Sequence, residues 1–350
     1  GAHTVPIFSQ KFVSRDFTRL GFMPDLMAVL GDDKEQFPNG PDTTNHNPVE
    51  VFSKCVGRWE VNPEQFNFVK KIGEGAMGVI YKATLNGKDV AAKKLKDRNR
   101  ENNLQAYKDL VMELDILVSI GRHPNLVEFK GACLVDRENP VIFEEFVTGP
   151  SLEEYFSKKI DSGYSYRPPR SVVYAWIMDM MRALEFLHNR DPIIIHRDMK
   201  PGNLLLTKDL TTLKLADFGM GKIIAKEMME TVNHTGYTGT VRYMAPEVFS
   251  CNKGHYTEKA DIYSAAIIMW FVATGQRPLI HGKQDLVWRP ELAPVEWPEL
   301  RDVMGKAWAG DPNLRPSASE VVKMMARLPG KPPPVQPSDF KSPGCGCCVQ

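Results

Sequence analysis

The chain has 350 residues, of which 43% are hydrophobic and 25% are charged, a composition typical of soluble proteins with a sizeable core. Lys and Arg number 44 against 43 Asp and Glu, so the formal net charge is +1. This balance excludes a global field that would attract nucleic acid or an anionic membrane, so any anion site must be local. The longest apolar run, residues 265–273, is far shorter than the roughly 20 residues of a membrane span and predicts a buried helix.

Cys55, Cys133 and Cys251 have neither pairing nor metal-ligand spacing, which predicts a reducing, cytoplasmic environment. Residues 1–60 are expected to form a partly disordered extension. Within them the stretch 31–48 is rich in Asn, Asp, Gly and Pro and offers little that could be buried.

Short strands are expected at residues 66–73, 78–85 and 89–95, where β-branched and aromatic residues recur. Asn86-Gly87 joins the last two and is a strong hairpin signal. The start of the ordered region is therefore predicted to be an antiparallel sheet.

Helices are expected to dominate the rest of the chain. Residues 104–120 have helical spacing, and residues 169–188 place an apolar residue at every fourth position from Val172 to Leu184. After residue 328 the chain becomes rich in Pro, which favours an extended conformation. Residues 329–350 are therefore expected to form a tether that ends in a cysteine motif.

Gly73, Gly75 and Gly78 have the G-x-G-x-x-G spacing. Dinucleotide-binding folds use the same spacing before a helix, but these glycines lie between two expected strands, which favours a loop over phosphates. Lys93 ends the third strand, and Glu113 follows in the next helical stretch. A solvated lysine is the alternative, but together with the glycine loop the two residues indicate a Lys–Glu pair that holds an ammonium against phosphates.

With these features in place, the chain resembles the eukaryotic protein kinase superfamily over about residues 66–328. Lys93 matches the strand-three lysine and Glu113 matches the αC glutamate of that family. The motifs that carry the rest of the resemblance are "HRDMKPGN" at 196–203, Asp217-Phe218-Gly219, "APE" at 245–247, Asp261 in "DIYSAAIIMW" and Arg315 in "DPNLRPS". The family pattern makes Arg315 the ion-pair partner of Glu247.

The resemblance implies an α+β bilobal kinase fold with ATP between the lobes. The small lobe, about residues 66–146, would contain an antiparallel sheet plus the αC helix, and the larger, mainly helical lobe would span about 147–328. The implied activity is transfer of the γ-phosphoryl group of Mg-ATP to protein hydroxyls.

That reaction depends on positioning and charge neutralisation more than on covalent chemistry. The resemblance implies that Asp198 accepts or orients the proton of the substrate hydroxyl and that Lys200 neutralises the charge of the γ-phosphate. Asn203 and Asp217 would supply oxygen ligands to Mg²⁺. His196 is expected to have a structural role, stacked with Phe218, Leu117 and Phe129. Nucleotide contacts are implied for Ile72, Gly73, Gly75, Gly78, Ile80, Ala91, Lys93, Glu145, Val147 and Leu205.

Gly239-Thr240 before "VRYMAPE", together with Lys200, is similar to the tyrosine-kinase-like group of Ser/Thr kinases, in which such a Thr hydrogen-bonds the catalytic Asp. Protein substrates with Ser or Thr are therefore expected. A pseudokinase scaffold, a dual-specificity kinase and a kinase-fold enzyme acting on a small molecule are the alternatives. The full set of catalytic residues argues against the first, and the "TGTVRYMAPE" segment argues against the last.

Alignment of "EEFVTGPSLEEYF" on the family hinge gives the gatekeeper position to Glu144, where an apolar residue or Thr is usual. A carboxylate there is costly to bury unless it is paired, and Lys93 is the candidate. A shift of one residue would instead give this position to Phe143.

Two further expectations concern regulation and location. Arg197 precedes Asp198, an arrangement that lets a phosphate on the activation segment pair with the arginine after an upstream kinase or autophosphorylation has acted. The available hydroxyls are those of Thr231, Thr235, Tyr237 and Thr238, with Thr235 or Thr238 favoured.

The last residues, "CGCCVQ", fit a C-a-a-X prenylation pattern at Cys347, and Cys345 is a candidate for palmitoylation. A solvated tail whose cysteines do nothing, or loosely bind metal, is the alternative. One lipid chain anchors a protein only marginally, so stable anchoring would need a second lipid, for which Cys345 is the candidate. Lipidation at both cysteines would attach the chain to the cytoplasmic face of a membrane.

Overall fold

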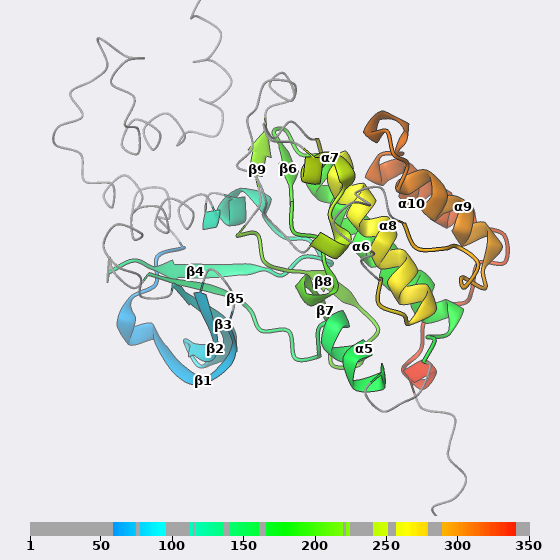
Figure 1. Cartoon of the computed structure of the whole chain (residues 1–350). Helices are drawn as coiled ribbons and strands as arrows, with labels where there is room; N and C mark the ends of the chain where they lie inside the picture. Colours follow the sequence, from blue (N-terminus) through cyan, green and yellow to red (C-terminus); the bar gives the residue numbers. More distant parts are fainter. Residues whose placement is uncertain are drawn as a thin grey trace, which may run out of the picture. The chain divides into compact units, whose positions relative to one another are not determined.

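The computed structural model describes residues 59–74, 78–95, 113–114, 116–135, 140–160, 166–219, 222–224, 241–250, 257–278 and 289–340. These residues form two compact units (Figure 1). The smaller unit contains 59–95 and 130–144, and the larger contains 113–129 and 145–340, each without the gaps above. The expected extension, apart from its last two residues, lies outside the described residues.

The smaller unit is built on a five-stranded sheet in the order β1-β2-β3-β5-β4. Its strands are β1 (Phe66–Glu74), β2 (Gly78–Leu85), β3 (Lys88–Leu95), β4 (Phe129–Cys133) and β5 (Val141–Glu145). β1, β2 and β3 pair antiparallel, as the sequence predicts. Asn86 and Gly87 turn the chain between β2 and β3 with φ angles of 49° and 77°. Both values are positive, as a type I′ turn in a two-residue hairpin requires.

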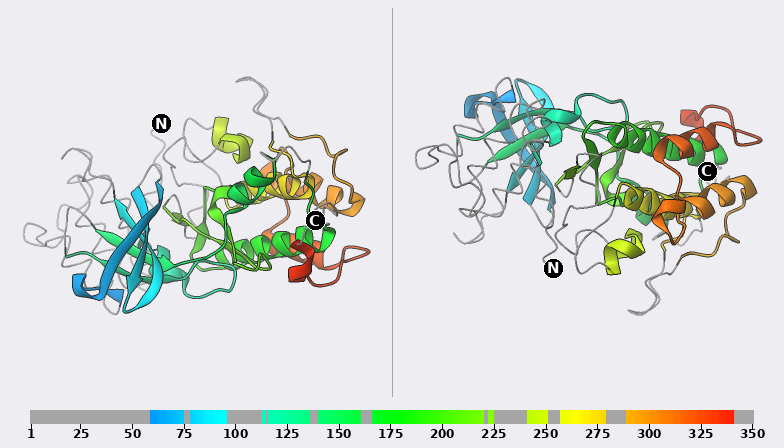
Figure 2. Two further views of the ribbon diagram at one scale, coloured as in Figure 1. Left: turned by 90° about the horizontal axis from the view of Figure 1, so that it is seen from below. Right: turned by 90° about the horizontal axis from the view of Figure 1, so that it is seen from above.

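The larger unit consists mainly of helices, which the two views in Figure 2 show from opposite sides. They are α5 (Leu152–Ile160), α6 (Arg170–His188), α7 (Pro246–Ser250), α8 (Lys259–Thr274), α9 (Pro298–Ala307) and α10 (Ala318–Ala326). α6 packs against α8 and α10, and α9 packs against α8. α8 contains the apolar run 265–273 and is buried along nearly its whole length, as its sequence predicts. No helix within the described part of the chain is long and apolar enough to cross a membrane.

Two short two-stranded sheets complete the larger unit. β6 (Ile193–Ile195) pairs antiparallel with β9 (Lys222–Ile224), and β7 (Leu204–Leu206) pairs antiparallel with β8 (Leu213–Leu215). The segment between β6 and β7 is the predicted catalytic loop.

The helix that carries Glu113 belongs to the larger unit, whereas the sequence assigned it to the small lobe. Residues 113–114 and 116–120 are helical. The guanidinium of Arg190, just after α6, donates to the carbonyl oxygen of Ser119 at 2.8 Å and also to that of Ile120. A cation that binds the last carbonyls of a helix satisfies acceptors that have no partner within the helix. This cap ties the helix to α6.

The Pro-rich segment after residue 328 contacts α6, although the sequence indicated a free tether. The ring of Phe340 stacks on Trp176 with centroids 5.9 Å apart and planes at 22°. The hydroxyl of Ser171 donates to the carboxylate of Asp339 at 3.0 Å, and the ammonium of Lys331 lies 5.3 Å from the ring of Tyr174. Residues 331–340 therefore lie along α6, and only later residues could act as a tether.

Candidate active site

The backbone of the predicted catalytic loop is held by Asp261 on α8. Its Oδ2 accepts a hydrogen bond from the amide of His196, and its Oδ1 accepts one from the amide of Arg197, both at 2.9 Å. Burial alone would raise the pKa of Asp261, but the hydrogen bond from His188 and further electrostatic and hydrogen-bonding interactions with His188 and His196 outweigh it and lower the pKa. The buried carboxylate is therefore held in its charged form, which can anchor two amides at once.

His188 is a site residue that the sequence reasoning missed. Its Nε2 lies 3.0 Å from Oδ2 of Asp261, and both side chains are almost fully buried. A signal was present, because His188 continues the series of apolar positions that runs along α6 to Leu184. A polar residue at a core position of this kind predicts a buried hydrogen-bond partner.

Asp198 lies between two donors of the same loop. The ammonium of Lys200 is 2.5 Å from Oδ2 of Asp198. The amide nitrogen of Asn203 donates to the backbone oxygen of Asp198 at 2.8 Å and to Oδ2 at 3.1 Å. The other carboxylate oxygen, Oδ1, is buried and accepts no hydrogen bond from any residue that the structure describes. One oxygen is thus fixed, and the other is left for a further donor.

The pairing of β7 with β8 determines where the two predicted metal ligands, Asn203 and Asp217, lie. Leu204 pairs with Leu215, and the amide of Ala216 donates to the backbone oxygen of Asn203 at 2.9 Å. This register holds the two candidate ligands on neighbouring strand ends. Both hydrogen bonds of the Asn203 side chain use its amide nitrogen, so its amide oxygen remains an acceptor.

The amide oxygen of Asn203 and the carboxylate of Asp217 are oxygen donors of the kind that Mg²⁺ binds, so the two residues fit this ion. Asp217 has a φ of 64°, a conformation that non-glycine residues rarely adopt. The amide of Gly219 lies 3.4 Å from Oδ1 of Asp217, a long contact for a hydrogen bond. The backbone of this motif thus adopts an uncommon conformation at the carboxylate.

His196 has the structural role that the sequence predicts. Its Nε2 lies 3.1 Å from the carbonyl of Ala216 and its Nδ1 lies 3.3 Å from the amide of Asp198, so the ring donates through Nε2 and accepts at Nδ1. The ring contacts Phe218 edge-on at 5.1 Å. Both nitrogens are occupied and the side chain is fully buried, which excludes proton exchange with a substrate. Leu117 and Phe129, the other members of the expected stack, are also buried.

In the smaller unit, the nucleotide candidates share one face of the sheet. Ile80 lies directly opposite Lys93 in the β2–β3 register, and Ala91 is two residues from Lys93 on the same strand. Residues in these positions point to the same side. Gly73 and Gly78 border this face from β1 and β2, and Ile72 is exposed next to Gly73.

The same alternation settles the gatekeeper register. Phe143 is fully buried in a cluster with Ala92 and Cys133, and its ring is 4.8 Å from that of Phe66. Because neighbouring residues on a strand face opposite sides, Glu144 lies on the face of Lys93. Phe143, the alternative, lies on the other.

The larger unit contains three further nucleotide candidates, Glu145, Val147 and Leu205, and the last of these is on β7. The carboxylate of Glu145 pairs with the ammonium of Lys214 at 2.8 Å. Lys214 lies opposite Leu205 in the β7–β8 register, so both point to the same side as this ion pair. Val147 and Leu205 are both half-buried. A partly exposed apolar side chain beside an ion pair suits contact with a planar, polar-edged base.

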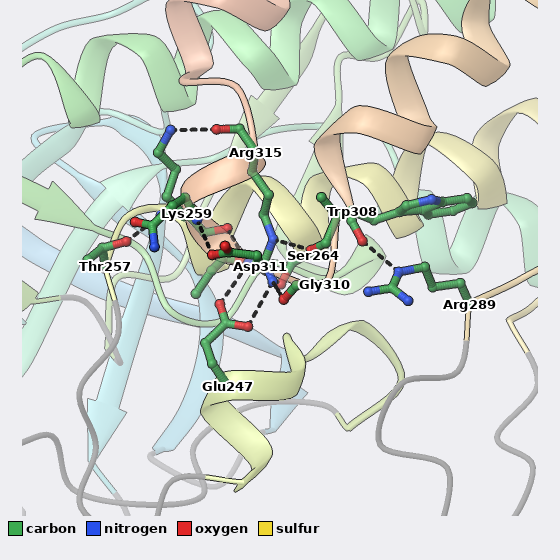
Figure 3. Close-up of polar contacts among 12 residues, drawn as sticks. Glu247, Thr257, Lys259, Ser264, Arg289, Trp308, Gly310, Asp311 and Arg315 are labelled. Carbon is green, nitrogen blue, oxygen red and sulfur yellow. Dashed lines mark hydrogen bonds and ion pairs between the residues drawn. The ribbon is translucent and has the colours of Figure 1, made fainter.

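The predicted pair of Glu247 and Arg315 is confirmed. The guanidinium donates to both oxygens of the carboxylate, at 2.6 and 2.8 Å (Figure 3). The side chain of Arg315 has no exposed surface, so the pair joins α7 to the loop before α10 from inside the unit. This geometry is the bidentate form that makes Arg pairs strong.

The remaining predicted site residues lie outside the described residues or in separate units. Gly75 and Thr240 lie outside the described residues, as do the four activation-segment hydroxyls and both tail cysteines. Lys93 is 8% exposed in the smaller unit and Glu113 is 3% exposed in the larger, and each is described within its own unit.

Comparison with known proteins identifies similar chains. Residues 66–325 match the family described as "Protein kinase domain". The chain is 34% identical over 293 residues to serine/threonine-protein kinase VIK of Arabidopsis thaliana, and the aligned region covers 80% of this chain and 64% of that protein. It is 32% identical over 314 residues to human mitogen-activated protein kinase kinase kinase 7, which covers 85% of this chain and 48% of the relative. The chain therefore spans less than two thirds of these relatives.

Proposed function

This chain belongs to the protein kinase family, and from this premise we propose that it transfers the γ-phosphoryl group of Mg-ATP to Ser and Thr hydroxyls of protein substrates. The observation that carries the proposal is the Asp198 carboxylate. One of its oxygens is fixed by Lys200 and Asn203, and the other is buried and free of hydrogen bonds from the described residues.

In the proposed reaction the substrate hydroxyl donates its hydrogen bond to Oδ1 of Asp198. The hydroxyl oxygen forms a new bond to the γ-phosphorus as the bond from that phosphorus to the β–γ bridging oxygen breaks, and ADP leaves. The hydroxyl proton passes to Asp198 and later to solvent. The hydrogen bonds at Oδ2 orient the carboxylate, so that Oδ1 faces the nucleophile without reorganisation.

Charge neutralisation is assigned to residues beside Asp198. Lys200 places its ammonium at the same carboxylate, where it can also bind a γ-phosphate oxygen as negative charge moves during transfer. Asn203 and Asp217 would hold Mg²⁺, which supplies charge compensation for the phosphates when bound. In the smaller unit, Lys93 is the residue that binds phosphate oxygens in this proposal.

Preference for Ser and Thr rests on the relatives and on Lys200. The plant relative is named a serine/threonine-protein kinase, and Lys200 is the residue found at this position in Ser/Thr kinases. A pseudokinase scaffold is disfavoured because Lys93, Glu113, Asp198, Asn203 and Asp217 are all present.

A peptide array tests the proposal. Purified protein is incubated with Mg-ATP labelled at the γ-phosphate on arrays of Ser, Thr and Tyr peptides. We expect label on Ser and Thr peptides only. Label on Tyr peptides as well would indicate dual specificity, and no label with any peptide, despite measurable nucleotide binding, would indicate a scaffold.

We also propose that phosphorylation of Thr235 or Thr238 orders the activation segment by pairing with Arg197, a basic residue beside the catalytic aspartate. The support is the sequence position of Arg197 and its backbone, which Asp261 fixes. Mass spectrometry of active protein should find phosphate between residues 220 and 241. Active protein without phosphate there would refute this step.

Lipid attachment at Cys347, with Cys345 as a second site, is proposed on the pattern "CGCCVQ" alone and requires that Gln350 is the natural end of the protein. Upon expression in cells with a free C-terminus, the protein should partition to membranes, and Cys347→Ser should release it. Equal solubility of the two proteins would refute the attachment.

A further inference from the structure

A groove of about 540 Å³ opens on the larger unit among α9, α10 and the short 3-10 turn η8 (Pro312–Leu314). None of the residues proposed for catalysis or nucleotide binding lines it. Its lining contains cations from four segments, α8, α9, η8 and α10, and three apolar side chains, those of Leu314, Pro316 and Met324. The groove therefore has features that the kinase reaction does not use.

Two of the cations form the structural floor of the groove. Arg315 donates to both oxygens of Glu247 and to the backbone carbonyls of Ala309, Lys259 and Gly310. The ammonium of Lys259 donates in turn to the carbonyl of Arg315 at 2.6 Å (Figure 3). Both side chains thus form hydrogen bonds within the protein, and the proposal below does not use them to bind an anion.

Three other cations are not engaged in this way. Lys306 is in the last turn of α9, Lys323 is on α10, and Arg327 caps the end of α10 one turn later. All three are exposed, and within the part of the chain that the structure describes none of them forms an ion pair. They form a local excess of positive charge on a chain whose formal charge is only +1.

Glu320 is the acidic side chain among the described lining residues, and it carries one negative charge against the three exposed cations. Its Oε2 accepts hydrogen bonds from the amide and the hydroxyl of Ser317, at 2.7 and 2.9 Å, in the capping box of α10. These hydrogen bonds lower the pKa of Glu320, and the positive charges of Lys259 and Lys323 add to the effect. Glu320 is therefore held in its charged form, but its single negative charge is outnumbered by Lys306, Lys323 and Arg327, so the charge at the groove is positive overall.

Apolar surface lies beside the cations. Leu314 on η8 is 72% exposed, the highest value among the described large hydrophobic residues of the protein that are exposed. Met324 on α10 is half-buried and lines the same groove. Exposure of a leucine side chain to water is unfavourable, and covering it by a partner lowers the free energy.

We propose that this groove is a docking site for an acidic segment of a partner protein. Asp or Glu side chains of the segment would pair with Lys306, Lys323 and Arg327, and an apolar side chain between them would cover Leu314 and Met324. A nucleic acid offers no aliphatic side chain for Leu314, and a flat lipid surface does not fill a concave site. Charge complementarity with apolar contact favours a peptide.

The test uses a fluorescent peptide in which Asp and Glu alternate with Leu, and a matched neutral peptide of Asn, Gln and Leu. Fluorescence anisotropy with the full chain should show binding of the acidic peptide that weakens as salt is added. The double variant Lys306→Glu/Lys323→Glu should lose about tenfold or more in affinity. Lys158→Glu, at an exposed lysine in the last turn of α5, is the control and should change affinity by less than about twofold.

Leu314→Ser should also weaken binding, and Arg327→Glu provides a single change at an exposed helix end in case the double variant does not fold. Equal binding of the neutral peptide, unchanged affinity in the charge-reversed variants, or an equal loss in Lys158→Glu would overturn the proposal. Binding to phosphatidylserine vesicles in preference to the peptide would also overturn it. Phosphorylation of a short substrate without an acidic segment should be the same in all these variants, which separates failure of docking from failure of the kinase reaction.

Discussion

The ammonium of Lys200 lies 2.5 Å from Oδ2 of Asp198, while Oδ1 of the same carboxylate is buried and accepts no hydrogen bond from the residues described. The two oxygens of one side chain therefore have different environments. One is fixed by a cation and by Asn203, and the other is available to a donor from outside the chain. This asymmetry is what a positioned general base requires.

Lys200→Met should lower kcat by about 10²-fold, because it removes a positioned positive charge at the reacting centre. The KM for ATP should change less, since the loss falls mainly on the transition state. Steady-state assays with a Ser peptide check this. Lys208→Met, at an exposed lysine in the turn after β7, is the matched control and should retain full activity. An unchanged kcat in Lys200→Met would exclude a role for this ammonium in transfer.

Arg315→Met should destabilise the larger unit by about 3 kcal/mol, because loss of one partner of a buried ion pair leaves the other uncompensated. Thermal unfolding measures the change. Arg277→Met is the control: its pair with Glu153, at 2.9 Å, has both side chains at least 40% exposed, so its loss should cost less than about 1 kcal/mol. Similar shifts in the two variants would contradict the assigned role of the buried pair.

Motifs with fixed spacing allowed much of the site to be predicted from the sequence. The order of strands β1 to β3, helix α6, the pair Glu247–Arg315 and the structural role of His196 all follow from patterns within short windows or from family resemblance. These features depend on local periodicity or on motifs that keep the same partners.

Contacts between distant segments were not predictable in this way. His188 belongs to a helix whose pattern is apolar, and only the three-dimensional position of Asp261 reveals its partner. Arg190 caps a helix some seventy positions earlier in the chain. The Pro-rich composition of residues 329–350 predicts an extended tether, but extension is compatible with packing along α6, where Phe340 stacks on Trp176.

The buried carboxyl group of Asp179 predicts that the free energy of unfolding depends on pH. Burial raises the pKa of its carboxyl, in spite of the hydrogen bond from the amide of Leu213 at 2.9 Å. A raised pKa in the folded state contributes stability below the unfolded value of 3.8, and this contribution is lost as pH rises through the folded pKa. Asp179→Asn has no such titration. The free energy of unfolding of the variant should therefore improve relative to wild type as pH rises from about 4 to 8. Denaturant unfolding at several pH values checks this, and a difference that is constant or moves the other way would contradict it.

Phe340→Ala should release residues 331–340 from α6, because it removes the ring that stacks on Trp176. Hydrogen exchange or limited proteolysis should show faster exchange or cleavage in this segment, with little change in α8. Val335→Ala, at a half-buried position in the same segment, is the control because it removes no ring. Equal protection of the segment in wild type and Phe340→Ala would show that the stacking does not hold it.

The central claim is that Asp198 is the base of a phosphoryl transfer to Ser and Thr. The most direct measurement compares wild type and Asp198→Asn for transfer of labelled phosphate from Mg-ATP to a Ser peptide, with thermal unfolding recorded for both. Asparagine preserves volume but cannot accept the hydroxyl proton. The account predicts a loss of about 10² to 10⁴-fold in kcat with an unchanged melting temperature. Transfer at the wild-type rate by folded Asp198→Asn would contradict it.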